Sequence, residues 1–177
     1  MSIDVLILPG RKLELAPGLF LGQLGLERRN PAAALVGETP ALLELGSREV
    51  VATDGALEPG RAYIFRLAAE NTLTLSIGLS TDFNEEEYVE DYGRNLSPEE
   101  RATIIEAWSQ AGPGLTLSSG GGRAAGELEL LAVLARCCAR DLSGWICIES
   151  GAFVHPRPGI YTSEQLEGVQ YRLKGQP

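Results

Sequence analysis

The sequence predicts an α+β fold, in which a largely antiparallel sheet is packed by two main helices at about 98–111 and 127–140, in a single domain covering residues 1–177. Short apolar runs alternate with Pro-Gly and Asp-Gly turn signals, which is typical of antiparallel strands. Two longer segments place apolar residues at helical spacing. The length of 177 residues, with 44% hydrophobic and 22% charged residues, fits one globular domain with a sizeable core.

The N-terminal part predicts a group of short strands followed by two short helices. Pro9-Gly10 and Pro17-Gly18 separate apolar runs, and such pairs mark turns. Asn30-Pro31 and Thr39-Pro40 each place a capping side chain before a proline suited to the first helical position. The expected elements are strands at 5–8, 13–16 and 19–24, and helices that end near Gly37 and Gly46.

Residues 48–79 predict a three-stranded antiparallel meander. β-Branched and aromatic residues gather in three runs, and Asp54-Gly55 and Glu70-Asn71 supply turn signals between them. In the last run, apolar residues alternate with polar or small ones at the period of a half-buried strand. The expected strands are 49–53, 62–67 and 72–79.

The two main helices are predicted by different signals. Ser97 and Glu100 have capping-box spacing, and Pro98 falls at the first helical position, so a helix begins there. Gly112-Pro113-Gly114 ends it. Apolar residues surround most of the circumference of the segment 127–140, which predicts a buried, central helix.

The C-terminal part predicts a hairpin and one more short helix. Glu149-Ser150-Gly151 is a turn signal between expected strands at 145–148 and 152–155. Thr162 and Gln165 again have capping-box spacing, which indicates the start of a short helix.

The composition argues against nucleic-acid and membrane partners. A formal net charge of −9 and a pI near 4.7 oppose binding to phosphate backbones, because affinity for them comes largely from Lys and Arg. The first segment lacks the basic region and the long apolar run of a signal peptide, and no later run is long enough to cross a bilayer. We therefore expect a cytoplasmic protein, and its preference for Arg over Lys indicates a GC-rich bacterial genome.

The cysteine and histidine content predicts no metal site, and no motif predicts a cofactor. Cys137, Cys138 and Cys147 are odd in number and have no CxxC spacing, so we expect buried thiols. His155 is the only histidine, which excludes sites built from several histidines. Across the expected hairpin, Cys147, His155 and Glu149 would form a nucleophilic set only if they share a face of the sheet, and we expect a structural role for His155.

A glycine-rich loop at 118–123 offers one alternative function. An expected strand at 115–117, this loop and the helix at 127 occur in the order in which phosphate-binding sites are built. The loop lacks the ending of a P-loop and the GxGxxG spacing of a dinucleotide fold. A flexible connection is therefore expected, and the alternative is a small enzyme or ligand-binding domain in which Arg123 holds an anionic ligand.

The segment 82–92 is the leading candidate site because it combines six acidic residues with aromatic ones and contains no basic residue. A solvated polar surface is the common explanation for a charge run. Aromatic residues among charges of one sign also suit a protein interface, in which the rings supply buried area and the acids steer a basic partner. The candidate partner-binding residues are Asp82, Phe83, Glu85, Glu86, Glu87, Tyr88, Glu90, Asp91 and Tyr92.

The C-terminal third also has a pattern that resembles a known family. The buried helix from Glu127 is followed by Leu142-Ser143-Gly144-Trp145-Ile146, the expected hairpin, and Pro158-Gly159-Ile160-Tyr161-Thr162. This order of elements resembles the C-terminal half of some cytoplasmic immunity proteins that neutralise bacterial toxins. The resemblance implies an acidic α+β protein that covers the basic active surface of a toxic enzyme, without catalysis and without a cofactor. The hypothesis is therefore a small acidic binding protein that inhibits a cognate toxin.

Overall fold

The structure is a computed structural model. It describes residues 3–12, 14, 41–52, 54, 57–58, 60–66, 73–77, 84–120, 126–149 and 153–174. The strands expected at 13–16 and 19–24 and the helix expected after Pro31 lie largely outside this part of the chain.

Along the chain, the described elements are four strands, two helices, a fifth strand, a third helix and four further strands. They are β1 (Ile3–Leu8), β2 (Ala41–Glu44), β3 (Ala62–Arg66), β4 (Leu73–Ile77), α2 (Glu85–Tyr92), α3 (Pro98–Ala111), β5 (Leu115–Ser119), α4 (Glu127–Asp141), β6 (Trp145–Ile148), β7 (Phe153–His155), β8 (Gly159–Tyr161) and β9 (Arg172–Leu173).

Seven of these strands form one antiparallel sheet in the order β2-β3-β4-β5-β1-β6-β8, and β7 pairs with β9 in a second, small sheet. β1 lies inside the large sheet, where Val5 pairs with Leu117 of β5 and Leu6 pairs with Cys147 of β6. The α+β fold class and the largely antiparallel sheet are confirmed.

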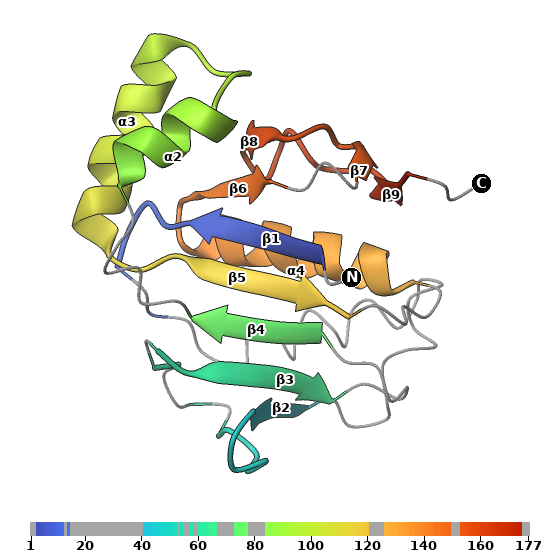
Figure 1. Cartoon of the computed structure of the whole chain (residues 1–177). Coiled ribbons are helices and arrows are strands. Elements are labelled where there is room, and N and C mark those ends of the chain that lie inside the picture. Colours follow the sequence, from blue (N-terminus) through green and yellow to red (C-terminus); the bar gives the residue numbers. More distant parts are fainter. Residues whose placement is uncertain are drawn as a thin grey trace.

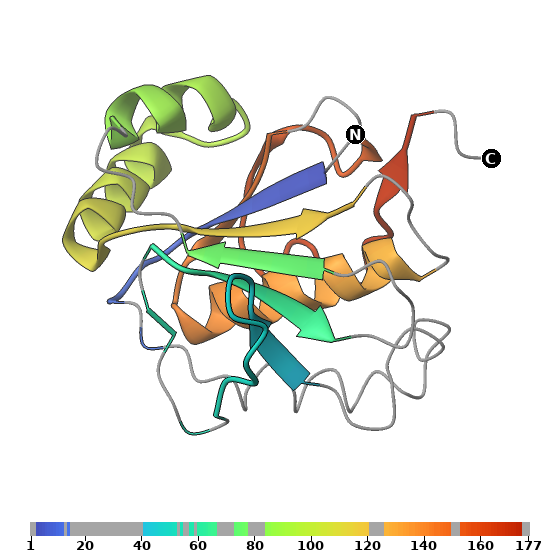
Figure 2. The ribbon, with the colours of Figure 1, turned by 60° about the horizontal axis from the view of Figure 1, so that its bottom comes forward.

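Helices cover both faces of the large sheet (Figures 1 and 2). α4 lies against one face, while α2 and α3 lie on the other side, near β1, β6 and β8. Because side chains alternate along a strand, β1 sends Val5 and Ile7 into the cluster with α4, and sends Leu8 into the cluster with α2 and α3. The acidic segment is therefore held on the face opposite α4.

The two main helices are confirmed. α3 begins at Pro98 behind a complete capping box, in which Ser97 and Glu100 bond to each other's backbone N–H groups. In α4, ten of the fifteen residues are buried, as expected for a helix that is apolar around most of its circumference. The three cysteines are free and buried, as expected.

Four local predictions are wrong. The segment expected to be helical after Pro40 forms β2, because Leu42 is fully buried and pairs with Phe65 of β3. Packing in the sheet therefore outweighs the local capping signal. The strand expected at 49–53 is reduced to a single bridge between Leu43 and Val50.

The expected hairpin of strands 145–148 and 152–155 does not form. β6 pairs with β1 and β8, and β7 pairs with β9, so a local turn signal gave the wrong partners. The C-terminal helix is also absent from residues 162–168. Thr162 and Gln165 do form the reciprocal capping bonds, but turns follow, and Gly168 has φ of +71°. The chain then returns to β9.

Candidate functional site

The acidic segment folds as helix α2, an element that the sequence analysis did not predict. The Asn84 side chain caps it by accepting a hydrogen bond from the backbone N–H of Glu87 at 3.4 Å. Three glutamates in the first turn complement the positive end of the helix dipole. Asn84 and Glu87 have the spacing of an N-cap and its third helical residue, and this signal would have revealed the helix.

One side of α2 is held in the core. Val89 is fully buried, and Tyr88 is only 9% exposed. The Tyr88 ring packs edge-on against Trp108 of α3, with 5.5 Å between the ring centroids, and lies 4.7 Å from the Tyr92 ring. The expectation that Tyr88 is an exposed aromatic anchor is therefore wrong, because the apolar residues of this short helix anchor it to α3 and the sheet.

The carboxylates of α2 point outward instead. Glu86, Glu87, Glu90 and Asp91 are exposed, and Glu85 is half-exposed. Tyr92 is also half-buried, so one ring remains available at the surface. Asp82 and Phe83, the first two residues of the candidate set, lie outside the described residues.

A hollow of about 500 Å³ lies beside α2, between the helix and the sheet. Its lining comes from α2, from β1 and β5, and from the residue that follows β6. The lining residues are Leu6, Asn84, Glu87, Tyr88, Asp91, Tyr92, Thr116 and Glu149.

The helix residues of this lining share one stripe, because they recur every three or four positions. The stripe brings Glu87 and Asp91 to the hollow, and Glu149 reaches it from the sheet. Three carboxylates and two tyrosines thus border one space. We refer to these five residues, Glu87, Tyr88, Asp91, Tyr92 and Glu149, as the acidic hollow. Its chemistry suits a cationic group, which carboxylates attract directly and ring faces attract through their quadrupole.

A part-buried polar contact joins two residues of the acidic hollow. The Tyr88 hydroxyl donates a hydrogen bond to the Glu149 carboxylate. Burial, together with the nearby Cys147 and Glu149, raises the pKa of Tyr88 far above its ordinary value. Burial also raises the pKa of the Cys147 thiol to about 12, although a hydrogen bond with Tyr88 opposes that rise. Cys147 is therefore a protonated thiol at neutral pH, which does not suit a nucleophile.

The raised pKa of the Cys147 thiol predicts a loss of stability at alkaline pH. The folded-state pKa of Cys147, about 12, lies above its ordinary value of 9.0. Its contribution is complete below pH 9 and falls as the pH rises toward 12, because only the unfolded chain then releases the proton. Between pH 9 and 10 we expect Cys147→Ala to lose about 1 kcal/mol less of its free energy of unfolding than the unaltered protein loses.

Urea unfolding at several pH values measures this difference. Ser109→Ala, on the exposed side of α3, is the control and should keep the slope of the unaltered protein. Equal slopes for Cys147→Ala and the unaltered protein would contradict a buried, protonated thiol.

The set formed by Cys147, His155 and Glu149 is not supported. His155 lies on β7, which pairs with β9 rather than with β6, so it does not lie across a hairpin from Cys147. His155 is also exposed, whereas Cys147 is fully buried on the face toward α2 and α3. Glu149 instead belongs to the acidic hollow, a role that the sequence did not indicate.

The structure describes only the start of the glycine-rich loop. Ser119, the last residue of β5, is buried, and its hydroxyl donates to the buried Glu127 carboxylate at 2.6 Å. Arg123, the candidate contact for an anionic ligand, lies outside the described residues. No cluster of three potential metal ligands occurs within the described residues.

Within the described residues, no helix has the length and apolar character needed to cross a bilayer.

Comparison with known proteins gives no relative for this chain. Neither the protein-family models, nor the curated proteins, nor the solved structures contain a match to this chain.

Proposed function

We propose that this chain is an acidic cytoplasmic binding protein that holds a basic surface of a protein partner through α2 and the acidic hollow, as an immunity protein holds a bacterial toxin. The observation that carries the proposal is the acidic hollow itself, in which three carboxylates and two tyrosines border a space of about 500 Å³. An arginine or lysine side chain of the partner is the group that suits this lining.

The distribution of charge agrees with such a partner. The net charge of −9 gives the chain a negative field that accelerates encounter with a basic protein. α2 contributes four exposed carboxylates to that field, from Glu86, Glu87, Glu90 and Asp91, and contains no basic residue.

The charges of α2 are arranged at a cost to the stability of the helix. Glu86 and Glu90, and likewise Glu87 and Asp91, are like charges four residues apart, which destabilises a helix by about 0.2–0.5 kcal/mol per pair. Glu90 and Asp91 also lie near the negative end of the helix dipole, where no basic residue compensates them. Carboxylates that oppose folding are expected where binding requires them.

This arrangement predicts a substitution that stabilises the protein. Glu90→Lys replaces a repulsive pair with an attractive one to Glu86 and places a positive charge near the C-terminal end of α2. We expect the free energy of unfolding to rise by about 0.5–1 kcal/mol. Urea unfolding at low salt measures it, with Glu129→Lys on α4 as a control that should not stabilise. A destabilised Glu90→Lys variant would show that the Glu90 carboxylate has a structural partner.

Affinity purification from the native cells tests the proposed function. The tagged protein and a Glu87→Lys, Asp91→Lys variant are purified in parallel, together with a Glu106→Lys, Glu129→Lys variant that makes the same change of charge elsewhere. We expect a stoichiometric basic protein to co-elute with the unaltered chain and the control, and to be lost from the first variant. Equal recovery with all three would exclude the acidic hollow as the binding surface.

A further inference from the structure

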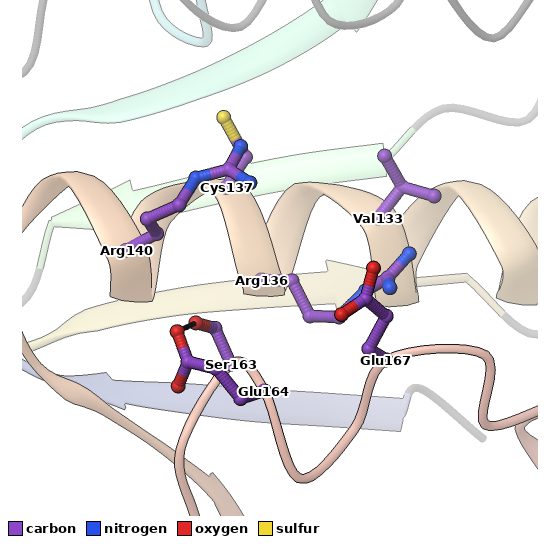
Figure 3. Close-up of a pocket in the computed structure, with 7 residues that line it drawn as sticks. All are labelled: Val133, Arg136, Cys137, Arg140, Ser163, Glu164 and Glu167. Carbon is purple, nitrogen blue, oxygen red and sulfur yellow. Dashed lines mark hydrogen bonds between the residues drawn. The ribbon is translucent and has the colours of Figure 1, made fainter.

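A second hollow, of about 130 Å³, lies on the other side of the sheet, between α4 and the turns at 163–168 (Figure 3). Its two walls carry opposite charges. Arg136 and Arg140 come from α4, one helical turn apart, and Glu164 and Glu167 come from the turns. The space is larger than a single water needs and has the size of a small molecule.

The walls are held apart by packing. Leu166, between the two glutamates, is 2% exposed and belongs to the core cluster with α4. The reciprocal bonds of Thr162 and Gln165 fix the start of the turns, at 2.8 and 3.3 Å. Within the described residues, neither Arg136 nor Arg140 forms an ion pair. The opposite charges therefore face each other across the hollow without direct contact.

Arg136 is the more strongly desolvated of the two arginines. Its Nε is shielded from solvent and has no hydrogen-bond partner among the described residues, and the same holds for the Tyr171 hydroxyl. The two groups are close enough that the charge of Arg136 opposes the rise in the pKa of Tyr171 that burial causes. The rest of the side chain is half-exposed, and a guanidinium that is partly shielded in this way binds an anion more strongly than one fully in water.

The two glutamates of the other wall differ in their hydrogen bonds. Glu164 already accepts a hydrogen bond from the Ser163 hydroxyl at 2.7 Å. Figure 3 shows Glu167 and Arg136 pointing toward one another from opposite walls, with Arg140 lying near Cys137. A simple anion would meet the carboxylates of one wall, and a simple cation would meet the guanidinium groups of the other. A molecule with both charges satisfies both walls.

We propose that this hollow binds a small zwitterion of the α-amino acid class, with its carboxylate on the Arg136 guanidinium and its ammonium group on the Glu167 carboxylate. Arg136 presents two N–H groups in the fork geometry that matches a carboxylate. The site does not depend on the proposed partner, since the acidic hollow lies on the opposite face of the sheet.

Isothermal titration calorimetry with glycine, L-alanine and L-serine tests the proposal, with acetate as the probe that has a carboxylate and no ammonium group. We expect at least one amino acid to bind, and Arg136→Gln and Glu167→Gln each to weaken that binding about tenfold or more. Arg136→Lys keeps the charge but loses the fork and should bind with intermediate affinity. Arg94→Gln and Glu129→Gln, exposed and outside this hollow, should bind as the unaltered protein does.

Two results would overturn the proposal. One is the absence of binding of all three amino acids to the unaltered protein up to their limits of solubility. The other is acetate binding as tightly as L-alanine with no effect of Glu167→Gln, which would leave the ammonium contact without a role. Far-UV circular dichroism on each variant separates a lost site from a lost fold, and Arg136→Lys keeps the test informative if Arg136→Gln fails to fold.

Discussion

Replacing Trp108 with alanine is expected to lower the free energy of unfolding by about 3–5 kcal/mol, the range observed for large aromatic side chains removed from a core. Trp108 is 2% exposed and belongs to the cluster that joins α2 and α3 to the sheet. Its edge-on contact with Tyr88 contributes beyond the area that it buries. No neighbouring element can fill the space, because Leu8 and Ile160 are fixed in paired strands.

Urea unfolding followed by tryptophan fluorescence and by far-UV circular dichroism measures this loss. Gln110→Ala, on the exposed side of α3, is the control and should change stability by less than about 0.5 kcal/mol. Because Tyr88 packs on Trp108, the variant should also lose the geometry of the acidic hollow. A loss below about 1 kcal/mol for Trp108→Ala would show that α2 and α3 are not packed on the sheet as described.

Reversing the charge of the acidic hollow with Glu87→Lys and Asp91→Lys is expected to weaken binding of a basic partner about 100-fold, which corresponds to about 2.7 kcal/mol. The reason is that a partner's cationic side chain inserted there would meet two new positive charges in a partly desolvated space. Such a change acts mainly on the dissociation rate. Glu86→Lys with Glu90→Lys alters the solvent side of the same helix and should act mainly on the association rate.

Surface plasmon resonance at several salt concentrations separates these two effects. The reduction in the association rate should fade at high salt, because screening acts on exposed charges. The increase in the dissociation rate should persist, since the acidic hollow is screened less. If both double variants change only the association rate, α2 steers the partner but does not contact it, and the acidic hollow is not the site.

Signals confined to a few neighbouring residues predicted the fold best. The capping box at Ser97 predicted α3 because buried residues at helical spacing follow it, whereas the same pair of bonds at Thr162 and Gln165 starts no helix. α4 follows from its own apolar circumference. β2 could not be predicted in this way, because the burial of Leu42 depends on pairing with β3 and not on its neighbours in the sequence. The partners of β6 were wrong for the same reason, since a turn signal does not specify which strand approaches.

The candidate site was predicted in part. The acidic residues of 82–92 identified α2 as an unusual surface, and Glu87, Asp91 and Tyr92 do border one hollow. The burial of Tyr88 was not predictable, since it depends on how α2 packs against Trp108. The position of Glu149 at the hollow was not predictable either, since it depends on where β6 lies in the sheet. The hollow beside α4 likewise requires Leu166 to bring a distant turn to Arg136.

The position of β1 also has a consequence for how the chain is made. Its two neighbours, β5 and β6, are synthesised much later, since Ile3 pairs with Ser119 and Leu6 pairs with Cys147. The ribosome adds about 5–20 residues per second, so the backbone N–H and C=O groups of β1 wait on the order of ten seconds for the strands that pair with them. Closure of the sheet is therefore delayed until β6 has left the ribosome, and during that interval β1 is an unpaired strand of the kind that favours aggregation.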